Sequence, residues 1–155
     1  IHQKPSSTEL ANIAIGVAQN AKKLGFIPKV AILSYSNFGN PSGSNTRTIN
    51  ECLKILEDKK VSFEFDGEMT AEVALDYNLI KENYPFCKLS GPANVLIMPD
   101  LYSANISFKL LQKMENLSVI GPIMIGGNNP FQIVQMGASV SDIVNSACIS
   151  TYNSL

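Results

Sequence analysis

The stretch PFQIVQMGASVSDIV, from Pro130 to Val144, has the pattern of an anion-binding site. A short apolar strand, a glycine turn at Gly137 and the start of a helix follow one another, and the backbone N–H groups at a helix start commonly hold an anion. The two residues that would face the anion, Gln135 and Met136, carry no charge. The pattern therefore predicts either a binding site or the remains of one.

The same stretch holds Ser139 and Asp142, whose spacing is that of a capping box at a helix N-terminus. A functional interpretation instead makes Asp142 a carboxylate poised over the thiol of a ligand or over a water. The spacing favours the cap, and one residue can fill both roles.

A second candidate is the loop SYSNFGNPSGSNT, from Ser34 to Thr46, which follows a predicted buried strand. It is long for a strand-to-helix connection, and long loops in compact domains are often functional. Ser34, Ser36 and Asn37 could donate hydrogen bonds to a phosphate or a carbonyl. The Gly-Lys-Ser/Thr ending of a P-loop is absent. A flexible surface loop explains the composition equally well.

A third candidate is the tripeptide from Asp66 to Glu68, which follows a predicted strand. Two carboxylates at a strand end could hold Mg²⁺. An Asp-Gly turn followed by an acidic residue at a helix start explains the same residues. We favour the turn.

These candidates require a scaffold in which strands and helices alternate. The periodicity of apolar residues predicts helices over 6–25, 46–60, 70–84, 101–114 and 139–151, and strands over 29–34, 61–65, 93–99, 118–126 and 131–134. Such alternation predicts an α/β fold with a mainly parallel sheet covered on both faces. In that fold, ligands bind beyond the carboxyl ends of the strands, where the candidate stretches lie.

Composition excludes several classes of protein. The 155 residues carry a net charge of −1, and the lysines and the single arginine are scattered, so neither nucleic acid nor a membrane is an expected partner. The N-terminus lacks the charged-then-apolar order of a signal peptide. Reduced thiols are typical of a cytoplasmic protein, which is the expected location. The chain begins without Met, which suggests a piece of a longer protein.

No metal site is predicted. Cys52, Cys87 and Cys148 have no metal-ligand spacing and are expected to be buried thiols, and the single histidine, His2, is terminal.

Several phrases together resemble the phosphotransacetylase domain, above all the version fused to the C-terminus of bacterial malic enzymes. They are AILSYSNFG, DGEMTAEVAL, GPANVLIMPDLYSANISFKLLQ, IGPIMIG and GASVSDIVN, in matching order from about Pro28 to about Thr151. The resemblance implies a three-layer α/β/α fold in two lobes, similar to isopropylmalate dehydrogenase. Residues 1–155 would be the C-terminal half of that domain, with the malic enzyme's catalytic domain upstream.

The resemblance also bears on the site at Gly137. In the family motif a Ser-Arg pair precedes the glycine and an aspartate follows, and these positions fall on Gln135, Met136 and Asp142. Only the aspartate is retained. An arginine would offer a fixed fork of donors to a phosphoryl group or an oxyanion, whereas methionine offers neither charge nor donor. Arg47, the single arginine, does not match the lost position.

The resemblance therefore implies a degenerate, regulatory and oligomerisation domain of an NAD(P)-dependent malic enzyme. The expected partners are a second copy of the chain, the upstream domain and an acetyl-CoA-like effector, while NAD(P) and the divalent metal would bind upstream only. The residues expected to bind the effector are Ser34, Ser36, Asn37, Gly39, Gly137 and Ser139. Two alternatives remain open, namely an active phosphate acetyltransferase that uses Asp142, and a purely structural oligomerisation module.

Overall fold

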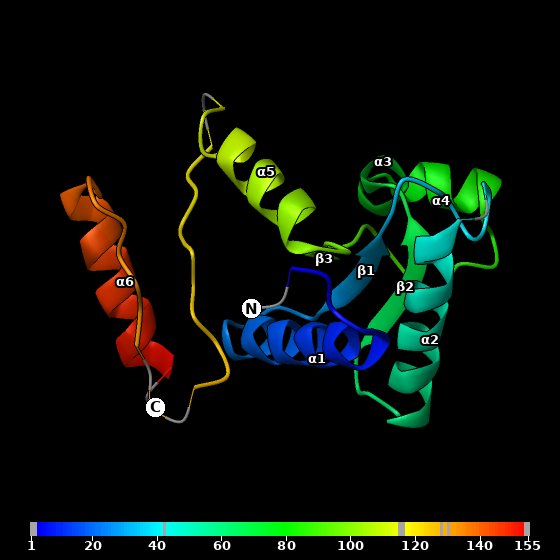
Figure 1. Ribbon diagram of the computed structural model, residues 1–155, viewed down its shortest axis with the longest axis horizontal. Coiled ribbons are helices and arrows are strands. Elements are labelled where there is room, and N and C mark those ends of the chain that lie inside the picture. The colour runs from blue at the N-terminus through cyan, green and yellow to red at the C-terminus, as the bar shows by residue number, and fades with distance from the viewer. Residues whose placement is uncertain (1–2, 42, 115–116, 128, 130, 154–155) are drawn as a thin grey trace. The chain divides into compact units, whose positions relative to one another are not determined.

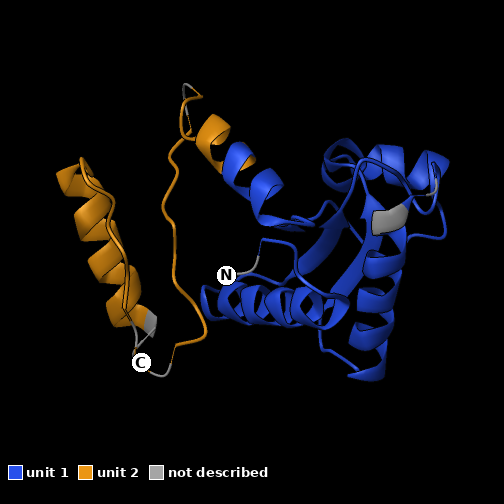
Figure 2. Ribbon diagram, viewed as in Figure 1, with its two compact units in different colours: residues 1–106 blue, residues 107–155 orange. Residues whose placement is uncertain are grey.

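The computed structural model describes residues 3–41, 43–114, 117–127, 129 and 131–153. The chain divides into two compact units, residues 1–106 and residues 107–155 (Figure 2). The first unit holds the sheet, and the second holds the end of one helix, an extended segment and the last helix.

Helices and strands alternate through the first unit, as expected (Figure 1). In chain order the elements are α1 (Ser7–Lys23), β1 (Lys29–Leu33), α2 (Ser44–Asp58), β2 (Glu64–Met69), α3 (Ala71–Leu75), α4 (Tyr77–Asn83), β3 (Val95–Ile97), α5 (Leu101–Leu111) and, in the second unit, α6 (Val140–Asn153). The strands form one parallel sheet in the order β2-β1-β3. The predicted α/β fold with a parallel sheet is therefore confirmed.

The central strand β1 is buried on both faces because its side chains alternate between two apolar clusters. Val30 and Ile32 pack with residues of α1 and α2, including Leu10 and Ile49. Ala31 and Leu33 lie in the second cluster, whose other buried members are Met69, Val73, Ala74, Ile80, Leu89 and Ala93. Helices thus cover both faces of the sheet, which gives the first unit three layers.

The segment from Asp66 to Glu68 is strand, so the predicted Asp-Gly turn is wrong. It belongs to β2, which runs over 64–69 where a strand over 61–65 was expected. Asp66 pairs with Ala31 and Gly67 with Ile32 of β1. A Cβ on Gly67 would lie 2.8 Å from the carbonyl oxygen of Ile32, so only glycine fits between the two strands without a shift. Pairing with the central strand overrides the local turn preference.

The expected helix over 70–84 is two helices, because Asp76 interrupts it. The Asp76 carboxylate accepts hydrogen bonds from the backbone N–H groups of Asn78 at 2.9 Å and Leu79 at 3.2 Å, which starts α4 anew. Short polar side chains compete with helix bonds in this way.

The strands expected over 118–126 and 131–134 do not form among the described residues. Several of their apolar side chains, including Ile120, Ile125 and Ile133, are exposed. A strand is stable only when a neighbour pairs with its backbone groups, and apolar periodicity alone does not supply that neighbour.

Candidate functional site

The β1–α2 loop, residues 34–43, leaves the carboxyl end of the central strand and is bonded to the end of β2. The backbone N–H of Ser34 donates to the carbonyl of Met69 at 2.9 Å, and that of Phe38 donates to the carbonyl of Glu68 at 2.7 Å. The loop therefore lies at the edge of the sheet where open parallel sheets bind ligands.

The side chains predicted to bind a ligand meet in this loop, and Ser34, Ser36 and Asn37 all have hydrogen-bond partners there. Ser36 is buried, with 1% of its surface exposed, and its hydroxyl donates to the Glu68 carboxylate. The Asn37 side-chain oxygen accepts from the backbone N–H of Thr70 at 2.8 Å. Ser34 is half-buried, with its Oγ 3.2 Å from that of Ser36. Because the Ser36 hydroxyl gives its single proton to Glu68, Ser34 is the donor in its bond with Ser36.

Phe38 and Gly39 form the tip of the loop in left-handed backbone conformations, with φ of 49° and 89°. Glycine adopts this conformation at little cost, whereas phenylalanine needs support from its surroundings. That support is aromatic, because the Phe38 ring lies 5.1 Å from the ring of Tyr84 and 4.9 Å from that of Phe86 between centroids. These contacts argue against the interpretation of the segment as a merely flexible loop.

Sequence reasoning missed the part that Glu68 plays in this loop. The side chain is fully buried, and its Oε1 accepts from the Ser36 hydroxyl, from the Gly39 N–H at 3.3 Å and from the Thr46 hydroxyl at 3.2 Å. Its Oε2 is buried and has no hydrogen-bond partner. The sequence offers no local signal for this role, because the residues from Asp66 to Glu68 are typical of a turn before a helix.

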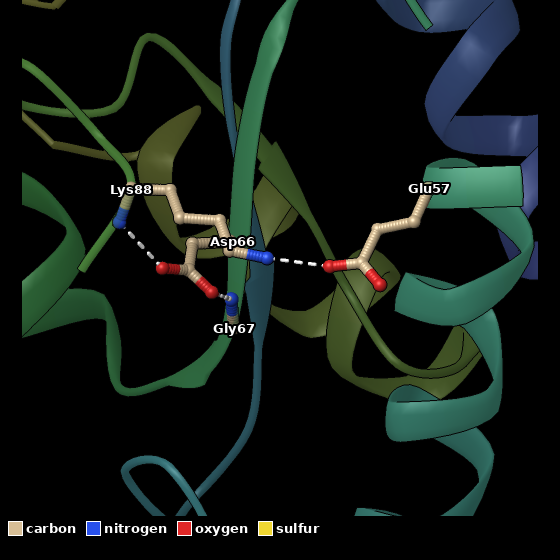
Figure 3. Close-up of polar contacts among 4 residues, drawn as sticks. All are labelled: Glu57, Asp66, Gly67 and Lys88. Atoms are coloured by element: carbon tan, nitrogen blue, oxygen red, sulfur yellow. Dashed lines mark hydrogen bonds and ion pairs between the residues drawn. The ribbon is translucent and has the colours of Figure 1, made fainter. Parts of the chain in front are cut away.

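Asp66, the other carboxylate of this tripeptide, is engaged by backbone donors (Figure 3). Its Oδ1 accepts from the N–H of Gly67 at 2.9 Å and its Oδ2 from the N–H of Lys88 at 2.7 Å. The Lys88 ammonium pairs with Glu57 of α2, and this hydrogen bond raises the pKa of Lys88. Within the described ranges, no group of three or more His, Cys, Asp and Glu could hold a metal ion. Through its bond to the Lys88 N–H, Asp66 holds the segment that leads into β3.

The second unit contains a pocket of about 450 Å³ that is lined by most of the other predicted site residues, although not by Ser139. Gln135, Met136, Gly137 and Asp142 all line it, together with Lys113. The Met136 side chain is fully exposed.

A second lysine, Lys109, lies beside these residues, and its ammonium donates to the Gln135 side chain at 3.1 Å. The surroundings of the pocket therefore contain lysine cations, which sequence reasoning did not single out.

Asp142 forms the capping box that its spacing predicted. Its Oδ2 accepts from the backbone N–H of Ser139 at 2.9 Å and from the Ser139 hydroxyl at 2.8 Å, and its own N–H donates back to that hydroxyl at 3.2 Å. The hydroxyl and the N–H of Ser139 lower the pKa of Asp142. A carboxylate with a lowered pKa is a weaker general base near neutral pH.

The remaining reactive side chains give no second centre among the described residues. Burial raises the pKa of the Cys52 thiol to about 12 and that of Cys87 to about 11, as expected for structural thiols. Cys148 is exposed, so the expectation that all three thiols are buried is wrong. Arg47 bonds to Glu51 at 3.1 Å on the surface of α2. His2 lies outside the described residues, and no described helix is long and apolar enough to cross a membrane.

Three relatives illustrate what this chain is similar to. An NADP-dependent malic enzyme of Rhizobium meliloti is 50% identical over 153 residues, which are 99% of this chain and 20% of that protein. A phosphate acetyltransferase of Helicobacter pylori is 39% identical over 146 residues, 94% of this chain and 28% of that protein. A solved phosphotransacetylase from Streptococcus pyogenes superimposes with a TM-score of 0.91 at 31% identity, over 99% of this chain and 47% of that one.

The chain thus spans 20% of the malic enzyme and 47% of the solved phosphotransacetylase. Its fold and its sequence point to the same group of proteins, and the resemblance carried by the phrases around the candidate sites is confirmed. With residues 1–151 matched, this chain belongs to the phosphate acetyl/butaryl transferase family.

Proposed function

We propose that this chain is a non-catalytic regulatory domain of an NAD(P)-dependent malic enzyme, and that it senses an acetyl-CoA-like metabolite. The high identity to a malic enzyme, of which the chain spans 20%, supports a place within a longer polypeptide. In that polypeptide an upstream domain binds NAD(P) and a divalent metal and converts malate to pyruvate and CO₂. The protein works in the cytoplasm.

The proposal rests chiefly on the side chains that line the pocket in the second unit. By resemblance to the family motif, its Ser-Arg pair would fall on Gln135 and Met136, and neither side chain offers a cation. Asp142, the retained acid, is engaged by the N–H and the hydroxyl of Ser139. Losing one preorganised oxyanion donor costs about 10²–10³ in rate, and here both matched partners are absent. Acetyl transfer by this site is therefore expected to be negligible.

The ligand-sensing part of the proposal rests on the β1–α2 loop. Its backbone is held at the carboxyl end of the central strand by bonds to Met69 and Glu68. The half-buried Ser34 hydroxyl could exchange its bond with Ser36 for one to a carbonyl or a phosphate group of the ligand. A loop that is already ordered binds at a lower entropic cost than a flexible one.

The oligomerisation part rests on the apolar surface of the second unit. Large apolar side chains are exposed there, among them Leu110, Leu117, Ile133 and Val144. Exposed apolar side chains in such number favour a surface that a partner covers. We assign the covering surface to other parts of the same polypeptide and to a second copy of it.

The alternative is an active phosphate acetyltransferase that exchanges acetyl between phosphate and coenzyme A. Two observations favour it, namely the 39% identity to the Helicobacter pylori enzyme and the lysines Lys109 and Lys113 near the pocket. A lysine could replace the arginine as a point charge, although without its fixed fork of donors.

Two assays on the full-length protein separate these functions. Acetyl transfer from acetyl phosphate to coenzyme A is expected to stay at background, while acetyl-CoA is expected to change the rate of malate decarboxylation. The double variant Gln135→Ser with Met136→Arg tests the stated cause, since it restores the family pair. Robust transfer by the unaltered protein that Asp142→Asn abolishes would establish the alternative. A malate rate that acetyl-CoA leaves unchanged would refute the sensing role.

A further inference from the structure

Two buried carboxylates stand on either side of Gly67 in β2, and their hydrogen bonds differ in kind. Asp66 divides its bonds, one for each oxygen, and both donors are backbone N–H groups of residues 67 and 88. Glu68 accepts three bonds on Oε1 and none on Oε2. All three donors to Glu68 come from residues 36–46, so this side chain serves one segment only.

The three donors mark three points along that segment. Ser36 stands near its start, Gly39 at its tip, and Thr46 in the first turn of α2. The Thr46 hydroxyl also accepts from the N–H of Gly43 at 3.2 Å, so the end of the loop and the helix start are bonded to the same group. A single side-chain oxygen on β2 therefore bonds to the beginning, the tip and the end of this segment, in addition to the backbone bonds of Ser34 and Phe38.

A fully buried carboxyl group is costly unless hydrogen bonds compensate for its lost hydration. Here one oxygen has no compensation, although an apolar residue of similar size would avoid the cost altogether. A residue retained on grounds of stability alone would not be expected to leave an oxygen unpartnered. The arrangement instead suggests that the chain keeps Glu68 for the conformation it imposes on the loop.

We propose that Glu68 is a positioning residue that holds the β1–α2 loop in the conformation that binds the effector. The inference rests on the proposed function, and Glu68 acts through Ser36, Gly39 and Thr46 without touching the ligand. When the three bonds are lost, the loop visits several conformations and the competent one becomes a fraction of the whole. The apparent dissociation constant then rises by the inverse of that fraction, so a competent population of about one tenth gives roughly tenfold weaker binding.

The test compares Glu68→Leu with Glu68→Gln in the full-length protein. Glutamine keeps an oxygen that can accept the three bonds, and its amide group would occupy the position of the unpartnered Oε2. Leucine keeps the apolar volume and offers no acceptor. Amide hydrogen exchange over residues 34–43 should be at least about tenfold faster for leucine, since the amides then exchange from an open loop, and near the unaltered rate for glutamine.

A matched control stands two residues away in the same strand. Asp66→Asn alters a buried carboxylate of β2 that bonds residue 88, so exchange should change around that residue and stay unchanged over 34–43. Acetyl-CoA titration of the malate reaction should show roughly tenfold weaker response for Glu68→Leu. The acetyl-CoA response of the Glu68→Gln protein should be close to that of the unaltered protein.

Three outcomes would overturn the inference. In the first, a folded Glu68→Leu protein shows unchanged amide exchange over residues 34–43. In the second, Glu68→Gln speeds this exchange as much as Glu68→Leu does. In the third, Asp66→Asn speeds it equally. If Glu68→Leu does not fold, Thr46→Val decides, because it removes one of the three donors and must show part of the faster exchange. A lack of acetyl-CoA response in the unaltered protein refutes the proposed function, while the exchange arm still decides the role of Glu68 in ordering the loop.

Discussion

Replacing Gly67 with alanine would place a methyl group against the backbone of the central strand. The added Cβ would lie 2.8 Å from the carbonyl oxygen of Ile32 and 3.0 Å from its Cβ. Ordinary contacts begin at 3.4 Å, so β2 would have to move by several tenths of an ångström relative to β1. The obstacle is backbone and not a flexible side chain, so it can yield only if the paired strands separate.

Overpacking of a core costs about 1–3 kcal/mol, and we expect the upper end here because the strand pairing itself is disturbed. Gly25→Ala is the matched control. Gly25 has a φ of +88°, and a Cβ there meets no atom within 4 Å, so its cost is backbone conformation alone, about 1–2 kcal/mol. Gly67 also has a positive φ, +159°, so both variants carry a backbone cost, and the close contact with Ile32 is present at Gly67 alone.

Urea unfolding of both variants measures the difference. Gly67→Ala should lower the unfolding midpoint by more than Gly25→Ala, without a change in the slope m that would signal an altered denatured state. The reasoning would be refuted if Gly67→Ala were no more destabilising than Gly25→Ala, because the close approach of β2 to β1 would then not constrain the residue.

Three further predictions follow from individual side chains. Asp142→Asn removes an ionised acceptor from the cap of α6 and should lower thermal stability slightly while leaving acetyl-CoA response intact; a large loss of response would give Asp142 a binding role. The Cys52 thiol, with a pKa raised to about 12 by burial, should resist a thiol reagent until global unfolding, and fast labelling of the native protein would contradict its place in the core. The backbone N–H of Ser90 lowers the pKa of Glu64, so this carboxylate stabilises the fold above its unfolded-state pKa, and the contribution is lost as pH falls through the folded-state pKa. Glu64→Gln should therefore weaken the decline of stability in acid, as measured by urea unfolding at a series of pH values.

The sequence by itself determined the order of the elements in the first unit and the capping of two helices. Apolar periodicity and capping residues act over a few neighbours, so they can be read without knowledge of the fold. Ser6 and Glu9 have the spacing of a capping box and form one at the start of α1, where the Ser6 backbone N–H donates to Glu9 Oε2 at 2.8 Å. The predicted box of Ser139 and Asp142 forms as well. The family resemblance, carried by phrases along most of the chain, was likewise available from the sequence.

Only the tertiary structure decided what the residues from Asp66 to Glu68 do. Their local preference is for a turn, but pairing of β2 with the central strand buries both carboxylates and directs them to different segments, residue 88 for one and residues 36–46 for the other. The segments over 118–126 and 131–134 show the converse, since they have strand-like composition and form no strand where the described chain offers no pairing partner. Strand formation and the partners of a buried carboxylate depend on groups distant in sequence, and for that reason no local pattern could have specified them.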